Sequence, residues 1–481
     1  MEEQLKKVQN ILTSYHQEHL IQFYEDLSEE KKAFLLNQIL SIDFDTIMSL
    51  YERPHFNIVE NTYEIEPLEY IDKSILDQTS INKYIDIGIE SLKNGEIAVI
   101  TLAGGQGSRL GFNGPKGIFQ LDTCPKISLF EVICNYLKYA CKKFNISIPW
   151  YIMTSTDNCP ATMDFFKKNN FFNYPKEDIM FFVQDNLPII DVNGKLILEE
   201  IYKVKVGSNG NGNIFSALKK AHLLENMRSR KIKWVFTGGI DNVLLNPVDP
   251  SFIGLTISSG NQISSKTIFK EDPLDPDWVF ARKCGKPAIV GCENFINEVS
   301  KVKDKDGKYL YRETNMLAHI FSIDALMYMQ DISLPYHKAF KKNTFINYEG
   351  MKQVPDSPNV YKFEQFIFDA FSQFDDITLL RVNPKEEFAP IKSFNGPYNP
   401  EIAKEMYEKK VLGRKETNFW SRSPLVIKMY QQGVIFLSIY FLHFYIIFNI
   451  WFTLAFTRLG DKYTSIASNL IYAFSSLFCF I

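Results

Sequence analysis

The first part of the chain repeats apolar side chains at the spacing of an amphipathic helix. Apolar positions between residues 11 and 27 follow a period of about 3.6, and Ser28 stands where a helix N-cap is expected. A polar stretch over residues 54–77 leads into a second helical pattern that ends near an Asn-Gly pair. The sequence therefore predicts a helical N-terminal region over residues 1–93.

The pattern changes after residue 94. Residues 97–102 form a short apolar run of the kind found in strands that are buried on both faces. Similar runs alternate with amphipathic stretches further along. The runs cover residues 150–154, 179–183 and 234–237, and the amphipathic stretches cover residues 129–143 and 214–230. This alternation predicts an α/β domain over residues 94–400, with a largely parallel sheet covered by helices.

Composition and charge narrow the class of protein. A length of 481 residues is enough for roughly three domains of about 150 residues each. The 53 Lys and Arg nearly balance the 56 Asp and Glu, which argues against nucleic acid as a partner. The seven cysteines include no C-x-x-C pair and indicate reduced thiols, and the charged first thirty residues lack the apolar core of a secretory signal. We therefore expect a cytoplasmic protein.

A glycine-rich segment directly follows the first predicted strand. It reads LAGGQGSRLG from residue 102 and continues to a Pro-Lys-Gly element at residues 115–117. Closely spaced glycines let backbone N–H groups approach phosphate oxygens, and Arg109 and Lys116 can add charge-assisted bonds to the same anion. The spacing fits neither the G-x-G-x-x-G fingerprint of dinucleotide oxidoreductases nor the Gly-Lys-Ser/Thr end of a P-loop. The segment predicts a phosphate-binding loop of another class.

The whole run LAGGQGSRLGFNGPKG over residues 102–117 resembles the signature of the UDP-sugar pyrophosphorylases, most closely the eukaryotic-type UDP-N-acetylglucosamine pyrophosphorylase family and its bacterial relatives. The likeness covers residues 20–400. It implies a Rossmann-like, GT-A-like nucleotidyltransferase fold, with a mostly parallel mixed sheet flanked by helices. It also implies a uridylyltransferase that joins UTP and a sugar 1-phosphate, with N-acetylglucosamine 1-phosphate favoured, to give a UDP-sugar and pyrophosphate.

The resemblance assigns UTP to the glycine loop and to two later segments. The glutamine that reads the uracil edge in the family corresponds to Gln184. The family's Gly-Asn-Gly-Gly loop lies at residues 210–213, where Asn213 replaces the last glycine and Ser208 replaces the usual proline. The implied UTP-binding residues are Leu102, Ala103, Gly104, Gly105, Gly107, Gln184, Gly210 and Asn211.

An acidic residue follows the predicted strand at 234–237. A carboxylate at the carboxyl end of a sheet strand is well placed to hold Mg²⁺, and the family has an Asp-Asn pair here. The resemblance therefore implies Mg²⁺ as the cofactor and Asp241 as its ligand. An aspartate that only shapes a turn is the alternative.

The residues expected to bind the sugar 1-phosphate are assigned by the resemblance alone. Lys362 and Lys392 match lysines that the family directs at phosphate groups. The implied sugar-binding residues are Gly212, Asn213, Asn315, Phe366 and Phe368. Gly291 and Cys292 stand where the eukaryotic enzymes carry a Glu-Tyr pair that binds the sugar hydroxyls, so N-acetylglucosamine, N-acetylgalactosamine and glucose all remain open.

The expected chemistry follows from the substrates. A sugar 1-phosphate has a second pKa of about 6 and is already a nucleophile at neutral pH, so no general base is needed. The enzyme must align the phosphate oxygen with the α-phosphorus of UTP and offset negative charge. We therefore expect Arg109, Lys116, Lys362 and Lys392 to be the catalytic residues.

The C-terminal segment, residues 401–481, has a different composition. Residues 433–457 form a stretch without charged side chains that is long enough for a transmembrane helix. Four basic residues before this stretch would keep the enzyme on the cytoplasmic side of the membrane. Translation of an AT-rich gene out of frame would give the same composition, and we favour that interpretation. A membrane is expected as a partner only if this tail is genuine.

Two other functions fit the same residues. One is a UTP–glucose-1-phosphate uridylyltransferase. The other is an inactive sugar-nucleotide-binding protein that has lost the C-terminal domain normal for the family. Pyrophosphate release from UTP with each sugar 1-phosphate separates the three.

Overall fold

The computed structural model describes residues 1–53, 65–270, 278–291 and 301–413 of the chain. Residues Met1–Glu408 form one compact unit. The predicted features at residues 433–457 and at Cys292 lie outside the described residues.

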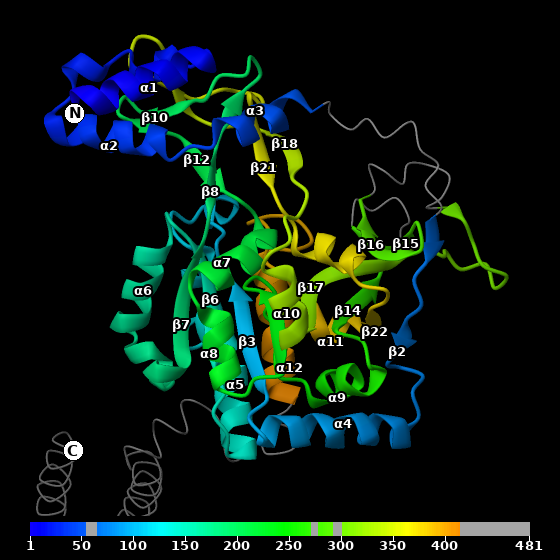
Figure 1. Cartoon of the computed structure of the whole chain (residues 1–481). Coiled ribbons are helices and arrows are strands. Elements are labelled where there is room, and N and C mark those ends of the chain that lie inside the picture. Colours follow the sequence, from blue (N-terminus) through cyan, green and yellow to red (C-terminus); the bar gives the residue numbers. More distant parts are fainter. Residues whose placement is uncertain (54–64, 271–277, 292–300, 414–481) are drawn as a thin grey trace, which may run out of the picture. The chain divides into compact units, whose positions relative to one another are not determined.

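A large mixed sheet forms the centre of this unit (Figure 1). Its strands are β1 (Ile65–Pro67), β2 (Ile71–Asp72), β3 (Ile97–Leu102), β6 (Trp150–Ser155), β7 (Ile179–Gln184), β13 (Trp234–Gly239), β14 (Ile263–Phe269), β15 (Val279–Lys283), β16 (Lys286–Val290), β17 (Glu313–Ser322) and β22 (Thr378–Arg381).

The order of the strands places four carboxyl ends side by side. The main path runs β2-β22-β14-β17-β13-β3-β6-β7, and β15 joins it through β17 while pairing with β1 and β16. Strands β13, β3, β6 and β7 are mutually parallel, whereas β17 is antiparallel to both β13 and β14. The four apolar runs predicted as strands are these four neighbours, so the prediction of a mostly parallel sheet is confirmed. The segments that follow β3, β7 and β13 consequently leave the sheet at the same edge.

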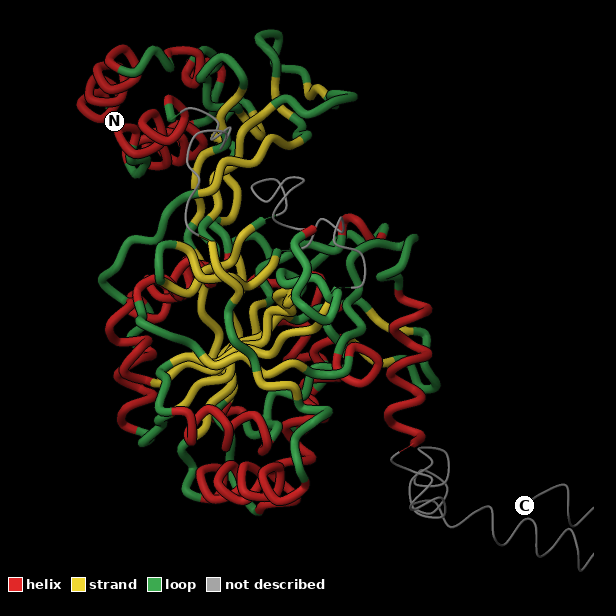
Figure 2. The backbone as a smooth tube through the Cα atoms, turned by 90° about the vertical axis from the view of Figure 1, so that its right-hand side faces the viewer, coloured by secondary structure: helices red, strands yellow, loops and turns green. Residues whose placement is uncertain are grey.

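Helices cover both faces of the sheet (Figure 2). The helices of the unit are α1 (Glu2–Ser14), α2 (Glu29–Leu40), α3 (Phe44–Glu52), α4 (Gln78–Lys93), α5 (Leu129–Phe144), α6 (Cys159–Lys168), α7 (Ile214–Lys220), α8 (Leu223–Ser229), α9 (Pro250–Ser259), α10 (Ile323–Met329), α11 (Pro384–Glu387) and α12 (Pro400–Gly413). Buried residues of α4, α5, α6 and α9 share one apolar cluster with the sheet, and those of α7, α8 and α10 share another. Alternate residues of β3 enter the two clusters, as expected for a strand covered on both faces.

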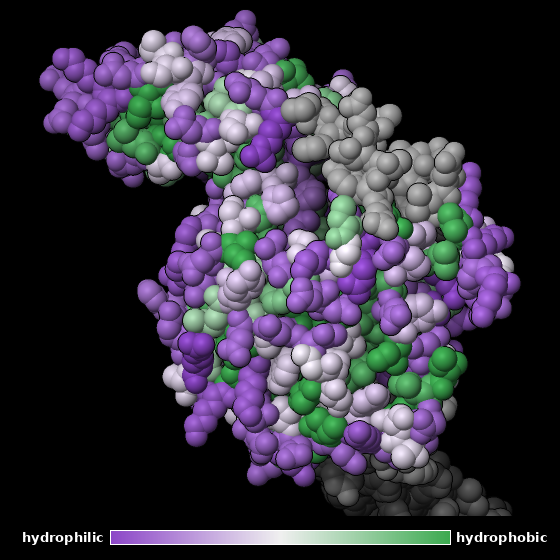
Figure 3. Space-filling view, turned by 45° about the vertical axis from the view of Figure 1, so that its right-hand side comes forward, coloured by the Kyte–Doolittle hydropathy of each residue, from purple (hydrophilic) through white to green (hydrophobic). Residues whose placement is uncertain are grey.

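The N-terminal helices α1, α2 and α3 pack on a separate set of short strands. These strands are β8 (Asn186–Pro188), β9 (Ile190–Asp191), β10 (Leu198–Glu200), β11 (Lys203–Val204), β12 (Val206–Ser208), β18 (His337–Lys341), β19 (Phe345–Ile346), β20 (Lys352–Gln353) and β21 (Val360–Glu364), and β4 (Gln120–Leu121) pairs with β5 (Ile127–Ser128) elsewhere. The three helices share an apolar cluster with residues of β9, β10, β11 and β21. On the face that Figure 3 shows, hydrophilic residues predominate over these helices and hydrophobic ones form small separate patches.

An N-terminal helical region is therefore confirmed, while its predicted boundary at residue 93 stays a prediction. The packing changes earlier than that, because β1, β2 and α4 all belong with the large sheet and its covering helices. Within the described residues, no single helix is long and apolar enough to cross a membrane, although the bent pair α2 and α3 meets that test by length and composition.

Candidate functional site

The glycine loop leaves the sheet at the end of β3 and closes on itself. The N–H of Ala103 donates to the carbonyl of Met153 on the neighbouring β6 at 2.8 Å, which anchors its first residue. The N–H of Lys116 donates to the carbonyl of Gly105 at 3.0 Å. Within the described part of the chain, the N–H groups of Gly104 and Gly105 donate no hydrogen bond. Two adjacent amides therefore remain available for an anion at the mouth of the loop.

Asn158, which our sequence analysis did not single out, supports this loop from behind. Its side chain is fully buried, and its amide donates to the carbonyls of Ala103 at 3.0 Å and Gly105 at 3.4 Å. Its own carbonyl accepts from the N–H of Ser155 at 2.8 Å. One buried amide thus ties the end of β6 to the glycine loop. An asparagine before a helix gives no sequence signal of this role.

Gln184 lies against the same loop. It ends β7, two strands away from β3, and only 4% of it is exposed. A Cβ on Gly104 would lie 2.1 Å from the Gln184 Nε2, so this approach requires a glycine. The predicted UTP-binding residues Gly104 and Gln184 are therefore in contact.

Lys116 and Asp241 meet at the edge of the sheet. The Lys116 Nζ lies 3.0 Å from the Asp241 Oδ2, and both side chains are partly buried. Lys116 comes from the end of the glycine loop, and Asp241 comes from the segment that follows β13. Because β3 and β13 are parallel neighbours, their carboxyl ends bring the loop and the carboxylate together.

Backbone contacts bring Lys392 and Arg109 to the same place. The N–H of Ile391 donates to the carbonyl of Asp241 at 3.0 Å, and the N–H of Phe394 donates to the carbonyl of Arg109 at 3.0 Å. The Lys392 Nζ lies 4.8 Å from the centre of the Tyr398 ring. Arg109 itself is exposed. The structure thus brings together the chain segments that carry three of the four predicted catalytic cations, and we call Arg109, Lys116, Lys392 and the carboxylate of Asp241 the cation group.

A buried ionic network supports the segment that carries Lys392. The Lys266 ammonium is fully buried, lies 2.8 Å from the Asp249 Oδ2 and also donates to Glu387. The Lys73 Nζ lies 3.3 Å from the Glu387 Oε1. Burial favours the neutral carboxyl, but the charges of Lys266 and Lys73 hold the pKa of both Asp249 and Glu387 below the usual range. Asn242 then accepts from the N–H of Ala389 at 2.9 Å and donates to the carbonyl of Glu387 at 2.8 Å, which aligns the segment with Asp241.

The loop at residues 210–213 packs on the segment after β21. Gly210 has a φ of +90°, and a Cβ there would lie 2.3 Å from the carbonyl oxygen of Gln365. The N–H of Gly212 donates to the same carbonyl at 2.9 Å, and the Asn211 Oδ1 accepts from the N–H of Ile367 at 3.0 Å. These contacts place the predicted nucleotide and sugar segments side by side.

The side chain of Asn213 forms hydrogen bonds with Asp185. Its Oδ1 accepts from the N–H of Asp185 at 2.7 Å, and its Nδ2 donates to the Asp185 Oδ2 at 3.1 Å. Both polar atoms of this side chain are directed at Asp185, and the sugar contact of Asn213 stays a prediction. The asparagine that replaces the family's glycine instead joins the 210–213 loop to the end of β7.

Lys362 does not join the cation group. Its Nζ lies 2.8 Å from the Glu364 Oε1 and 3.4 Å from the Ser208 Oγ. Its side chain passes over Gly207, where a Cβ would lie 2.8 Å from the Lys362 Cε. Lys362 therefore lies on β21 with its side chain against β12, the strand that leads into the 210–213 loop.

Asn315 reaches the site through an irregularity in β17. The pairing of β17 with β14 shifts between Asn315 and His319, and Leu317 there has a φ of +56°. The Asn315 Oδ1 accepts from the N–H of Leu317 at 2.8 Å. The Leu317 side chain in turn lies 3.0 Å from where a Cβ of Gly239 would be, two residues before Asp241. The bulge therefore brings Leu317, two residues after Asn315, against the segment that carries Asp241.

Four rings form an aromatic group next to Asn315. The ring centres of Phe366 and Phe368 are 5.1 Å apart, and that of Trp278 is 5.6 Å from Phe366 and 5.2 Å from Phe368. His337 completes the group at 4.8 Å from Phe366. The two phenylalanines are predicted sugar ligands by resemblance, whereas Trp278 could not be predicted, because no motif marks it.

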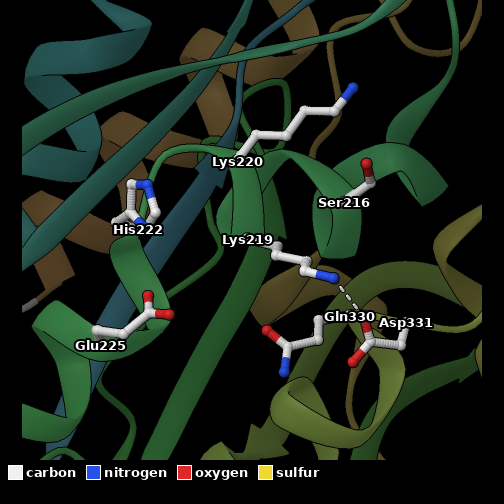
Figure 4. A pocket seen from close by; sticks show the side chains of 7 residues that line it. All are labelled: Ser216, Lys219, Lys220, His222, Glu225, Gln330 and Asp331. Carbon is white, nitrogen blue, oxygen red and sulfur yellow. Dashed lines mark hydrogen bonds and ion pairs between the residues drawn. The ribbon is translucent and has the colours of Figure 1, made fainter.

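A hollow on the surface over α7, α8 and α10 lies apart from these residues. It is lined by Ser216, Lys219, Lys220, His222, Glu225, Gln330 and Asp331 (Figure 4). Lys219 pairs with Asp331, and Lys220 pairs with Asp185 at 2.6 Å. No residue of the glycine loop or of the cation group lines this hollow, so it is not part of the phosphate site that those residues indicate.

Comparison with known proteins agrees with this arrangement. The chain is 34% identical over 385 residues to a probable UDP-N-acetylglucosamine pyrophosphorylase of Schizosaccharomyces pombe, covering 76% of this chain and 80% of the relative. It is 36% identical over 342 residues to the UDP-N-acetylglucosamine pyrophosphorylase of Saccharomyces cerevisiae, covering 68% and 71% of the two chains.

A solved structure agrees in the same way. The crystal structure of uridine diphosphate N-acetylglucosamine pyrophosphorylase from Trypanosoma brucei in complex with an inhibitor superposes with a TM-score of 0.70 at 27% identity, over 84% of each chain. Residues 55–396 match the family described as UTP–glucose-1-phosphate uridylyltransferase. With that match over most of its length, and with a glycine loop, a glutamine packed against it and a lysine–aspartate pair at one edge of its sheet, the chain belongs to the UTP–glucose-1-phosphate uridylyltransferase (UDPGP) family.

Proposed function

We propose that this protein is a uridylyltransferase that joins UTP to N-acetylglucosamine 1-phosphate and releases pyrophosphate, with UDP-N-acetylglucosamine as the other product. The observation that carries the proposal is the Lys116–Asp241 pair at the mouth of a glycine loop with two unused amides. The names of the relatives support N-acetylglucosamine as the sugar.

The nucleotide would lie along the glycine loop. The N–H groups of Gly104 and Gly105 would donate to phosphate oxygens, and Arg109 would reach the triphosphate from an exposed position. The side chain of Gln184 makes no hydrogen bond within the described residues, so its amide would be available to the uracil edge. Because Gln184 contacts Gly104, the base and the phosphates would occupy neighbouring positions.

Lys116 and Lys392 would offset charge during transfer. The sugar 1-phosphate oxygen attacks the α-phosphorus of UTP while the bond to the β-phosphate oxygen breaks and pyrophosphate leaves. No proton has to be removed, since the attacking phosphate is already ionised. Lys116 and Lys392 would lower the repulsion between the two anionic reactants. They would also stabilise the negative charge that develops on the departing pyrophosphate.

Asp241 fits a magnesium ligand. Mg²⁺ is commonly bound by one or two carboxylates together with substrate phosphates and water. The single carboxylate of Asp241 beside the anion site matches that donor set, and Lys116 engages only its Oδ2. When bound, the ion would neutralise phosphate charge and help align the triphosphate.

The sugar would lie between the cation group and the aromatic group. The Nδ2 of Asn315 makes no hydrogen bond within the described residues, so it can donate to a sugar hydroxyl or carbonyl. Gly212 brings its backbone onto the segment leading to Phe366. Lys362 is proposed to face the sugar phosphate after its Glu364 partner gives way.

Pyrophosphate release tests the proposal directly. The full chain with UTP and Mg²⁺ is supplied in turn with N-acetylglucosamine, N-acetylgalactosamine and glucose 1-phosphates. We expect turnover with N-acetylglucosamine 1-phosphate. Binding of UTP without turnover of any sugar would instead support an inactive sugar-nucleotide-binding protein.

Glucose 1-phosphate is the second candidate because Trp278 occupies space within the aromatic group. The higher kcat/KM decides between the two sugars. A cytoplasmic location belongs to the same proposal and rests on the cysteine usage, with each described cysteine a free thiol.

A further inference from the structure

Trp278 holds a position that bears on which sugar can enter the site. The N–H of Asn315 donates to the carbonyl of Trp278 at 3.0 Å, so the two residues are neighbours on adjacent strands. The Trp278 ring packs at an angle on both Phe366 and Phe368, yet 36% of the residue remains exposed. The indole is therefore partly exposed next to residues that are predicted to bind the sugar.

Gly291 makes room for the indole. Residues Val279–Lys283 and Lys286–Val290 form a hairpin, and its two ends carry Trp278 and Gly291. A Cβ on Gly291 would lie 3.3 Å from two carbon atoms of the Trp278 ring, tighter than ordinary van der Waals contact. Any side chain at position 291 would crowd the ring, so the glycine and the tryptophan fit together as a pair.

The other neighbours limit where the indole can move. His337 meets the Trp278 ring edge to face at 6.1 Å and is itself held by a 2.7 Å hydrogen bond from its Nε2 to the Asp369 Oδ2. Phe368 is buried, so it cannot turn aside easily. The indole is thus a stiff wall rather than a mobile surface side chain.

From these contacts we infer that Trp278 is the specificity-determining residue for the substituent on the sugar ring, and that its indole limits the size of the group accepted there. The inference rests on the proposed function. An N-acetylamino group is larger than a hydroxyl, so the indole disfavours N-acetylhexosamine 1-phosphates relative to hexose 1-phosphates, compared with a smaller side chain at the same position. Steric differences of one small group in a pocket change kcat/KM by about 10- to 200-fold.

The test compares two substrates in matched variants of the full chain. In Trp278→Leu, the ratio of kcat/KM for N-acetylglucosamine 1-phosphate to that for glucose 1-phosphate should rise about tenfold or more. Trp278→Phe, which keeps an aromatic ring, should change the ratio less. Gly291→Ala should change the ratio less than Trp278→Leu, because the added methyl group displaces the ring by only a few tenths of an ångström. The KM for UTP should stay the same in all three variants.

Tyr328→Leu is the control. Tyr328 lies on α10, is 55% exposed and packs against the ring of Phe374. Its truncation therefore removes a similar aromatic contact outside the site. It should leave the ratio unchanged. An unchanged ratio in Trp278→Leu, or an equal loss with both sugars, would overturn the inference.

Binding of the products keeps the inference testable in a variant without turnover. The Kd of UDP-N-acetylglucosamine relative to that of UDP-glucose, from titration calorimetry, should shift in the same directions. If the unmodified protein turns over no sugar 1-phosphate, the proposed function fails. If it turns over a sugar but neither ratio moves in the Trp278 variants, only the role of Trp278 fails.

Discussion

Lys116 and Asp241 form an ion pair of 3.0 Å between residues 125 positions apart in the chain. The pair joins the glycine loop after β3 to the segment after β13. Because each charge is partly withdrawn from water, the pair fixes both side chains at the place where the triphosphate is proposed to bind. Its two members allow separate tests of charge and of metal binding.

Removal of the Lys116 charge should impair transfer strongly. In Lys116→Met, which keeps most of the side-chain volume, we expect kcat for pyrophosphate release to fall about a hundredfold or more, as found when one stabilising donor is removed from an active site. Steady-state kinetics with saturating UTP measures the effect.

Lys126→Met is a matched control. Lys126 pairs with Asp122 at 3.2 Å, but both side chains are mostly exposed. Its loss should change kcat little. A comparable loss in both variants would show that Lys116 has no special role in transfer.

The carboxylate of Asp241 should govern the magnesium requirement. Asp241→Asn removes the charge while keeping the shape, so we expect the Mg²⁺ concentration for half-maximal rate to rise about tenfold or more. Chelation of the metal should stop turnover in the unmodified protein. Asp122→Asn serves as the control on an exposed carboxylate, and an unshifted Mg²⁺ dependence in Asp241→Asn would argue for a turn-forming aspartate.

Only part of the fold around these residues could be predicted from the sequence. The four strands around the site were predictable, because strands covered on both faces have continuous apolar runs. The insertion of β17 as an antiparallel strand between β13 and β14 was not, since strand direction depends on long-range pairing. The bulge at Leu317 arises from the same pairing, so no local pattern reveals that Leu317 packs against the segment that carries Asp241.

Two further residues escaped prediction for a similar reason. Asn158 and Trp278 act through contacts with segments far away in the chain, and each belongs to a residue type with many ordinary uses. By contrast, the approach of Gln184 to Gly104 agrees with the roles implied for both by the resemblance, although their contacts with UTP stay a prediction.

Asn158 should matter for UTP binding as well as for stability. Asn158→Ala leaves the buried carbonyls of Ala103 and Gly105 without their side-chain donor, which costs about 1–3 kcal/mol of unfolding free energy. A loop that is held less firmly should also raise the KM for UTP more than the KM for the sugar 1-phosphate. Urea denaturation and steady-state kinetics give the two values.

Asn169→Ala is the comparison. Asn169 donates to the carbonyl of Phe165 at an exposed position on the helix that follows Asn158. Its loss should be small in stability and absent in KM. An equal effect of the two substitutions on the KM for UTP would contradict a role of Asn158 in shaping the loop.

His319 should contribute to acid sensitivity. It is fully buried in the sheet, shares a hydrogen bond with Ser265 and has an Nε2 without a partner among the described residues. Burial lowers the pKa of His319 to about 3, whereas an unfolded histidine has a pKa of about 6.5.

Between these two pKa values, the unfolded chain binds a proton at His319 and the folded chain does not, so the free energy of unfolding falls by about 1.4 kcal/mol for each pH unit below 6.5. In His319→Gln, which cannot take up that proton, the decline of the unfolding free energy from pH 6.5 to pH 4.5 should be shallower by about 2–3 kcal/mol. The exposed His222→Gln variant should keep the original slope. Urea titrations across this pH range measure both slopes, and parallel curves for His319→Gln and the unmodified protein would place the acid sensitivity elsewhere.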